Sequence, residues 1–160
     1  MKIRLRLNDK DNEKAIARYN VSTDWKLLSY CLTTAYNWIK PNRAKGTTNI
    51  YVKIREDDSL AGWYNYSNTL YININNNETY EEFVKTIFHE FCHWKQYMID
   101  NRPSNSMVAK RPNRWDCEDA ELEAENWELI GIKALEIYNC LSYSKNIANE
   151  YHSRPNEGEQ

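Results

Sequence analysis

Two histidines one helical turn apart, with a glutamate between them, are the residues of this sequence best suited to chemistry. The stretch His89-Glu90-Phe91-Cys92-His93 has the form H-E-x-x-H. On an α-helix, residues four apart lie on the same face, so both imidazoles can bind one metal ion. Glu90 is the next residue after His89 and lies about 100° further around the helix, where it can reach a water molecule on the metal without binding the metal itself. The motif predicts zinc (Zn2+) bound by His89 and His93, with Glu90 as the catalytic base.

The chemistry requires these residue types. Zinc lowers the pKa of a bound water molecule from about 15.7 to about 7, and a carboxylate can accept the proton and pass it to a leaving amine. The alternative is that two histidines share a helix face by chance. A random chain of this length would contain the motif about once in a few hundred cases. Because two of the three histidines of the chain lie in the motif, we favour the zinc site.

A catalytic zinc site needs a third protein ligand and keeps a fourth position open. The metzincin pattern places a glycine three residues and a histidine six residues after the motif, where this chain has Gln96 and Ile99. SprT-type proteases use a third histidine soon after the metal helix, but residues 94–151 contain none. His152 lies in a polar tail and is a poor ligand candidate. A carboxylate is therefore the expected third ligand.

An acidic cluster downstream of the motif offers such carboxylates. Residues 117–127 read CEDAELEAENW, and Glu118, Glu121 and Glu125 fall on one stripe of a predicted helix. A stripe of this kind is commonly a solvent-exposed face. The residues alone therefore leave three candidate ligands open.

At this cluster the chain resembles the gluzincin metallopeptidases, in which a glutamate on a helix downstream of H-E-x-x-H completes the zinc site. The downstream pattern of that family, E-x-x-A followed by an acidic residue, matches ELEAE at 121–125. The resemblance implies that Glu121 binds the metal and that Ala124 lets the two helices pack closely. It also implies that Glu125 orients a histidine N–H. Glu118 and Glu125 remain the alternative ligands.

The order of the predicted elements extends the resemblance over residues 45–140. The chain is most similar to small phage-encoded or bacterial metallopeptidases, and more distantly to ImmA/IrrE-type proteases. The resemblance implies hydrolysis of peptide bonds in a protein or peptide substrate. It also implies that the strand before the metal helix lies at a sheet edge and binds substrate as an added strand, through Leu70, Ile72 and Ile74. An ordinary half-buried strand is an equal alternative.

The helix that carries the motif begins at a recognisable signal. The stretch TYEE at 79–82 fits a capping box, in which the threonine caps the helix and the second glutamate reaches back. Apolar residues at helical spacing then predict a helix over 80–98. After a polar loop at 100–114, a second long helix from residue 115 or 116 to near 141 would carry the acidic cluster.

The N-terminal half predicts a sheet. A helix is expected to begin after Ser22-Thr23-Asp24 and to end near Ile39. Alternating apolar residues predict strands at 2–7 and 49–56, and the short Ser67-Asn68 turn predicts that two further strands, at 60–66 and 69–75, form a hairpin. The whole pattern predicts an α+β, compact zincin-like domain, in which a small antiparallel or mixed sheet packs on helices.

Length and charge limit the remaining possibilities. The 160 residues predict one domain at 1–143 and a flexible tail at 144–160. A net charge of −2 argues against a broad surface for nucleic acid or for an anionic membrane, so neither is expected as a partner, although a local patch could exist. No signal peptide or membrane span is recognisable, and the cysteines are scattered, so a cytoplasmic protein with free thiols is expected.

A second function class stays open beside the peptidase. The same fold could serve as a non-catalytic binding or regulatory module that zinc only stabilises. Glu90 argues against this alternative, since a purely structural site needs no base at that position.

Overall fold

The computed structural model describes residues 1–39, 46–57, 60–64, 67–100 and 115–153, with side chains for all of these except 115–117 and 142–153. The predicted loop at 100–114 therefore lies outside the described residues from 101 onward, as does the tail from 154. The described chain is α+β, as predicted. Its elements, in chain order, are β1 (Lys2–Arg6), α1 (Asp9–Tyr19), α2 (Trp25–Ile39), β2 (Thr47–Arg55), β3 (Gly62–Tyr64), β4 (Thr69–Asn73), α3 (Tyr80–Met98) and α5 (Trp115–Ser153).

The four strands form one mixed sheet in the order β1-β2-β4-β3. β2 runs parallel to both β1 and β4, whereas β3 pairs antiparallel with β4. The predicted hairpin between the last two strands is thus confirmed, and so is the mixed alternative for the sheet. The parallel pairs explain the long connections, because parallel neighbours cannot be joined by a tight turn.

The prediction that residues 69–75 form an edge strand is wrong. β4 pairs with β2 on one side and with β3 on the other, so both of its edges are occupied. Leu70, Ile72 and Ile74 point into the core, where they are 0, 0 and 3% exposed. These three side chains are therefore core residues and not a substrate-binding surface. The edge strand on this side of the sheet is β3.

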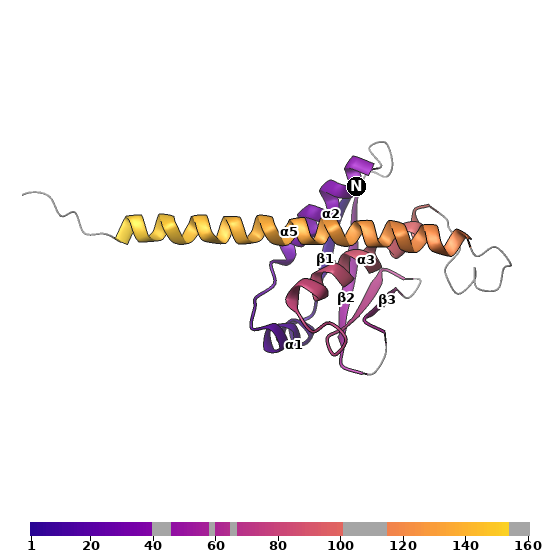
Figure 1. The fold of residues 1–160 in the computed structure, drawn as a ribbon, viewed down its shortest axis with the longest axis horizontal. Helices are drawn as coiled ribbons and strands as arrows, with labels where there is room; N and C mark the ends of the chain where they lie inside the picture. Colours follow the sequence, from indigo (N-terminus) through magenta and orange to yellow (C-terminus); the bar gives the residue numbers. More distant parts are fainter. Residues whose placement is uncertain (40–45, 58–59, 65–66, 101–114, 154–160) are drawn as a thin grey trace, which may run out of the picture.

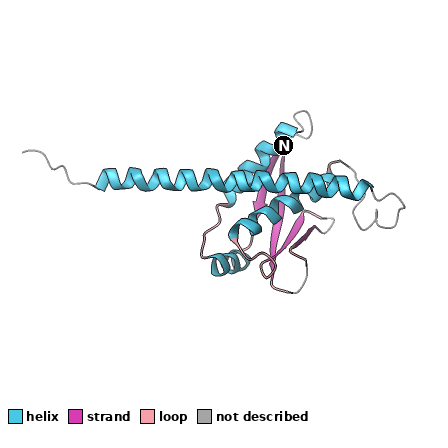
Figure 2. Cartoon of the chain, in the orientation of Figure 1, coloured by secondary structure: helices cyan, strands magenta, loops and turns pink. Residues whose placement is uncertain are grey.

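The helices form two layers on one face of the sheet. Figure 1 shows α5 crossing in front of α3, which in turn lies in front of the strands. α2 lies beside β1 and also contacts α5. Figure 2 shows the same layers by type of structure, with the long α5 extending well beyond the sheet. The core lies between the sheet and the α2–α3 layer, and α5 closes it from outside.

Two helices differ from the sequence prediction. No element is predicted at residues 9–19, where the structure has α1, capped by the Asn8 side chain, which accepts from the Asp11 N–H at 2.7 Å. This helix is easily missed because its only buried residues are Asp11 and Ala15. α5 continues to Ser153, so its predicted end near 141 is wrong and residues 144–153 of the predicted tail are helical.

The outer edge of β1 is covered by hydroxyl groups of α2. The Ile3 N–H donates to Thr33 Oγ1 and the Leu5 N–H donates to Ser29 Oγ, both at 2.9 Å. Ser29 and Thr33 are four residues apart on a helix, a rise of about 6 Å, and Ile3 and Leu5 are two residues apart on a strand, a rise of about 6.6 Å. The hydroxyl groups and the amides therefore have matching spacings. Because these amides are already bonded, β1 offers them to no further strand. β3 forms the other edge of the described sheet.

A buried asparagine fixes β3 and β4 against α3. Asn77, which is 1% exposed, donates through its Nδ2 to the carbonyl groups of Ala61 and Asn73, at 2.9 and 2.7 Å. Its Oδ1 accepts from the Thr86 hydroxyl of α3 at 2.6 Å. The side chain thus uses both of its ends to join the strand hairpin to the helix that carries H-E-x-x-H.

We expect Gly62→Ala to destabilise the protein, because β3 lies close against α3 at this residue. A Cβ atom at position 62 would lie 2.5 Å from Thr86 Cγ2 and 2.9 Å from Glu90 Cγ. Such overpacking costs about 1–3 kcal/mol, which urea unfolding would measure. Thr86→Ser removes the nearer atom and keeps the hydroxyl, so Gly62→Ala/Thr86→Ser should recover part of the loss. Wild-type stability for Gly62→Ala alone would contradict this packing.

Candidate metal centre

The start of α3 has the predicted capping box. The Glu82 N–H donates to Thr79 Oγ1 at 3.2 Å, and the Thr79 N–H donates to the Glu82 carboxylate at 3.0 Å. Phe83, Ile87 and Phe91 are fully buried and hold the helix on the sheet and on α5. The position of the capped helix is therefore fixed by local hydrogen bonds and by core packing together.

Small residues on α5 let it approach α3 closely. Ala120, Ala124 and Ala134 are buried, with exposures of 7, 0 and 1%. At Gly131 an added Cβ would lie 3.2 Å from Phe88 Cδ2 of α3, which leaves little room for a side chain. The expected role of Ala124 at a close helix contact agrees with its complete burial.

The close approach brings three possible metal ligands together. The Nε2 atoms of His89 and His93 lie 3.0 Å apart. Glu121 Oε2 lies 3.4 Å from the His89 Nε2, and Glu121 Oε1 lies 3.6 Å from the His93 Nε2. Tetrahedral ligands at about 2.1 Å from a zinc ion are about 3.4 Å apart, close to these three separations. Among the described residues, His89, His93 and Glu121 are the group of ligand-type side chains that could hold one ion.

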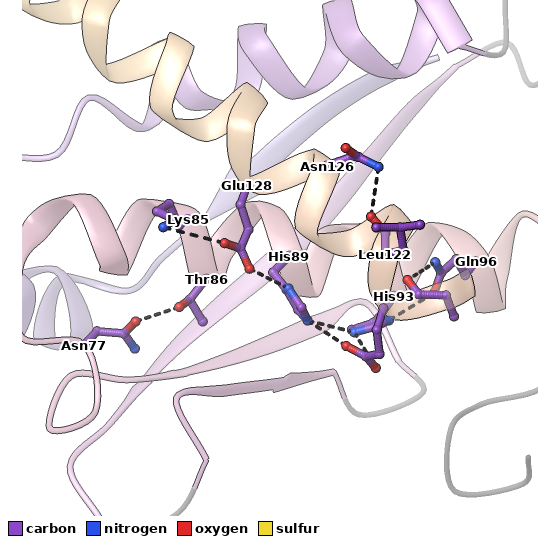
Figure 3. A network of polar contacts seen from close by, with 11 residues as sticks. Asn77, Lys85, Thr86, His89, His93, Gln96, Leu122, Asn126 and Glu128 are labelled. Atoms are coloured by element: carbon purple, nitrogen blue, oxygen red, sulfur yellow. Dashed lines mark hydrogen bonds and ion pairs between the residues drawn. The ribbon is translucent and has the colours of Figure 1, made fainter. Parts of the chain in front are cut away.

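A hydrogen bond on the far side of each imidazole ring fixes the direction of the histidines (Figure 3). The Nδ1 of His89 lies 2.8 Å from Glu128 Oε1, and the Nδ1 of His93 lies 3.0 Å from Gln96 Oε1. Both oxygens are acceptors, so each Nδ1 carries a hydrogen, and Nε2 is then the nitrogen of each neutral ring that can bind a metal. A neutral imidazole that carries its hydrogen on Nδ1 can offer the Nε2 lone pair to a metal ion.

The orientation of the Gln96 amide is itself fixed. Its Nε2 donates to the Ala120 carbonyl at 2.9 Å and to Glu123 Oε2 at 3.1 Å. The same Glu123 carboxylate accepts from the buried Lys95 at 2.6 Å. Since the amide nitrogen serves these two acceptors, the amide oxygen must face His93. The ligand geometry of His93 thus depends on a chain of polar contacts between α3 and α5.

The structure distinguishes among the glutamates of the acidic cluster. It brings Glu121 to the histidines, while Glu118 and Glu125 are exposed and outside the ligand group. The prediction that Glu125 orients a histidine is wrong, because Glu128 and Gln96 occupy the two Nδ1 positions. Glu128 follows Glu121 by seven residues, nearly two full turns, and so lies on the same face. That spacing is the signal by which the sequence could have indicated Glu128.

Glu90 occupies a different environment from the ligands. It is 6% exposed and lies beside Gly62 of β3. Burial, reinforced by the nearby charge of Glu121, raises the pKa of the Glu90 carboxyl to about 8, although a hydrogen bond from the Tyr64 backbone opposes the rise. A carboxyl group with a pKa close to neutral is well suited to take up and release a proton.

Comparison with known proteins does not assign the chain to a family. No protein-family model matches the chain, and no curated protein or solved structure gives a significant match. In the described residues, no helix is long and apolar enough to cross a membrane. The likeness to gluzincins therefore depends on the motif residues and on their arrangement.

We expect Glu90→Gln to stabilise the metal-free protein at neutral pH. The carboxyl has a pKa of about 8 when folded and 4.5 as its ordinary value, so the unfolded chain ionises first. Stability should therefore fall as the pH rises from about 4.5 to about 8, by a few kcal/mol in all. Glutamine carries no charge and avoids this loss.

Thermal unfolding in the presence of a chelator would test this expectation. The melting temperatures of wild type and Glu90→Gln should coincide near pH 4 and diverge by about pH 8. An equal difference at every pH would mean that the carboxyl does not ionise late in the folded protein.

Proposed function

We propose that this protein is a zinc-dependent metallopeptidase of the gluzincin type. The observation that carries the proposal is the convergence of His89 Nε2, His93 Nε2 and Glu121 on one point, with the buried Glu90 carboxyl near enough to interact with the charge of Glu121. Three protein ligands are the number that a catalytic zinc site uses, because the fourth position must stay open. A structural site would be closed by a fourth side chain and would need no base.

Each residue has a separate task in this proposal. The two histidines and Glu121 would hold the zinc, which supplies Lewis-acid chemistry by polarising a carbonyl group and lowering the pKa of water. Glu90 would take the proton from the attacking water and later give it to the leaving amine. Glu128 and Gln96 would keep both imidazoles in the tautomer that offers Nε2.

The edge strand β3 is the best place for a peptide substrate. β3 forms one edge of the described sheet and contacts α3 at the position of Glu90. A peptide that added to β3 as a further strand would run past the base and the ligand cluster. Main-chain hydrogen bonds would then supply affinity. The proposed substrate is accordingly an extended segment of a protein or peptide.

The cysteines support a reducing compartment such as the cytoplasm. Cys31, Cys92 and Cys140 are free thiols in the described structure, and Cys140 is exposed. An exposed thiol would form disulfides between molecules in an oxidising compartment. We therefore place the proposed activity in the cytoplasm.

Zinc binding should distinguish Glu121 from its neighbours on α5. We expect wild type to bind one zinc ion per chain, and Glu128→Gln to weaken binding about 10- to 100-fold because His89 loses its charged acceptor. Glu121→Gln should weaken binding further, whereas the matched control Glu125→Gln should leave it unchanged. Isothermal titration calorimetry measures all four proteins. Failure of the wild type to bind zinc would refute the metal site, and equal losses for Glu121→Gln and Glu125→Gln would refute the ligand assignment.

Hydrolysis should depend on Glu90 without a change in metal content. We expect Glu90→Gln to reduce cleavage of a fluorogenic peptide library by at least about 100-fold while zinc stays bound. Glu81→Gln, an exposed glutamate on the same helix, is the matched control and should retain activity. A wild-type protein that binds zinc but cleaves no peptide would favour the non-catalytic regulatory module.

A further inference from the structure

The face of the sheet that points away from α3 carries a concentration of positive charge. The basic set on this face consists of Lys2, Arg4 and Arg6 of β1 with Lys53 and Arg55 of β2. All five are exposed, and they alternate with buried core residues along each strand. The core side of these strands is covered by helices, whereas the basic side chains point outward.

The charge on this face is segregated from the rest of the molecule. The four strands read KIRLR, TTNIYVKIR, GWY and TLYIN, so they contain five basic residues and no acidic residue. The whole chain, in contrast, has 23 acidic residues and a net charge of −2. Arg55 pairs with Asp57 at 3.1 Å at one end of the face. Among the described residues, Lys2, Arg4, Arg6 and Lys53 form no salt bridge.

Aromatic side chains stand beside the basic set on the same face. The aromatic set consists of Tyr51, Tyr71 and Trp63. Trp63 and Tyr71 stack with their centroids 4.9 Å apart and their planes at 4°, and Lys53 Nζ lies 5.8 Å from the centre of the Tyr71 ring. Tyr51 is 52% exposed and is the register partner of Arg6. Thus Arg6 lies beside Tyr51 in one cross-strand pair, and Lys53 lies beside Tyr71 in another.

We propose that this outer sheet face binds single-stranded nucleic acid. Unpaired bases stack on exposed rings, while lysine and arginine contact the phosphates, and this combination is the usual basis of single-strand recognition. Arg4 and Arg6 point the same way about 6.6 Å apart, a spacing that lets them contact successive parts of one extended backbone. Arg6 lies beside Tyr51 and Lys53 beside Tyr71, so a base stacked on either ring would have a cation next to it for its phosphate.

Other anionic partners fit this face less well. An acidic peptide or an anionic membrane would satisfy the basic set but offers no flat rings for Tyr51 or for the Trp63–Tyr71 pair. A membrane surface would also favour protruding aliphatic side chains, which the outward positions of the strands lack. The proposed metal centre involves α3 and α5 on the opposite side of the sheet. This binding surface is therefore independent of the proposed peptidase activity.

Fluorescence anisotropy with labelled oligothymidine and oligouridine of about 15 nucleotides would test the proposal, because this length covers a site of one small domain. Binding should weaken steeply as salt is raised. Arg4→Gln/Lys53→Gln should weaken binding about tenfold or more, and Tyr51→Ala about fivefold or more. The matched control Lys10→Gln/Lys133→Gln removes two exposed charges elsewhere and should bind as wild type does.

Several results would overturn the proposal. One is an absence of binding at low salt. Another is an equal loss of affinity in the Lys10→Gln/Lys133→Gln control, which would show that only net charge matters. Full affinity in both Tyr51→Ala and Trp63→Ala would exclude stacking on the aromatic set. Binding to polyglutamate, or to vesicles of anionic phospholipid, as tight as binding to the oligonucleotides would point to a general anion surface instead. Thermal unfolding checks that each variant is folded.

Discussion

The close packing of α3 against α5 is the contact on which the rest of the structure depends. Phe91 of α3 and Trp127 of α5 lie 5.1 Å apart between ring centres, and both are buried. Gly131 leaves room for Phe88, because a side chain in its place would meet that ring. All three proposed ligands come from these two helices. The separation of the histidines from Glu121 is therefore set by apolar packing, and a change in the core would alter the proposed metal centre.

Polar contacts along the same interface fix what packing alone would leave free. Lys95 is 1% exposed and donates to both Glu123 and Asp100, at 2.6 and 2.8 Å. Burial acts to lower the pKa of Lys95, but these two carboxylates outweigh it and raise the pKa above its ordinary value. An apolar interface tolerates sliding, whereas a buried charge must keep its partners. This cluster, joined to Gln96 through Glu123, accordingly fixes the register of α5 against α3 and the orientation of His93.

Local signals explain which parts of the molecule could be predicted from sequence. The capping box and the helical spacing predicted α3, the alternation of apolar residues located β1 and β2, and a short turn indicated the β3–β4 hairpin, because these signals act within one element or one turn. The edge position of β4 was predicted wrongly, since pairing between distant strands leaves no local trace. Glu128 was missed for a related reason. Its contact with His89 depends on where two helices cross, and the family pattern ends at residue 125 before reaching it.

The charge of the sheet shows how an average can conceal a surface. A net charge of −2 is a sum over the whole chain, and it is unaffected by which side chains share a face. The alternating stretch KIRLR predicts a strand from its buried Ile3 and Leu5, yet its exposed Lys2, Arg4 and Arg6 carry the electrostatic information. Parallel pairing then sets Arg6 beside Tyr51 and Lys53 beside Tyr71. One sheet thus separates two chemically distinct surfaces, because its buried side must be apolar to hold α3 while its outer side is free to carry charge.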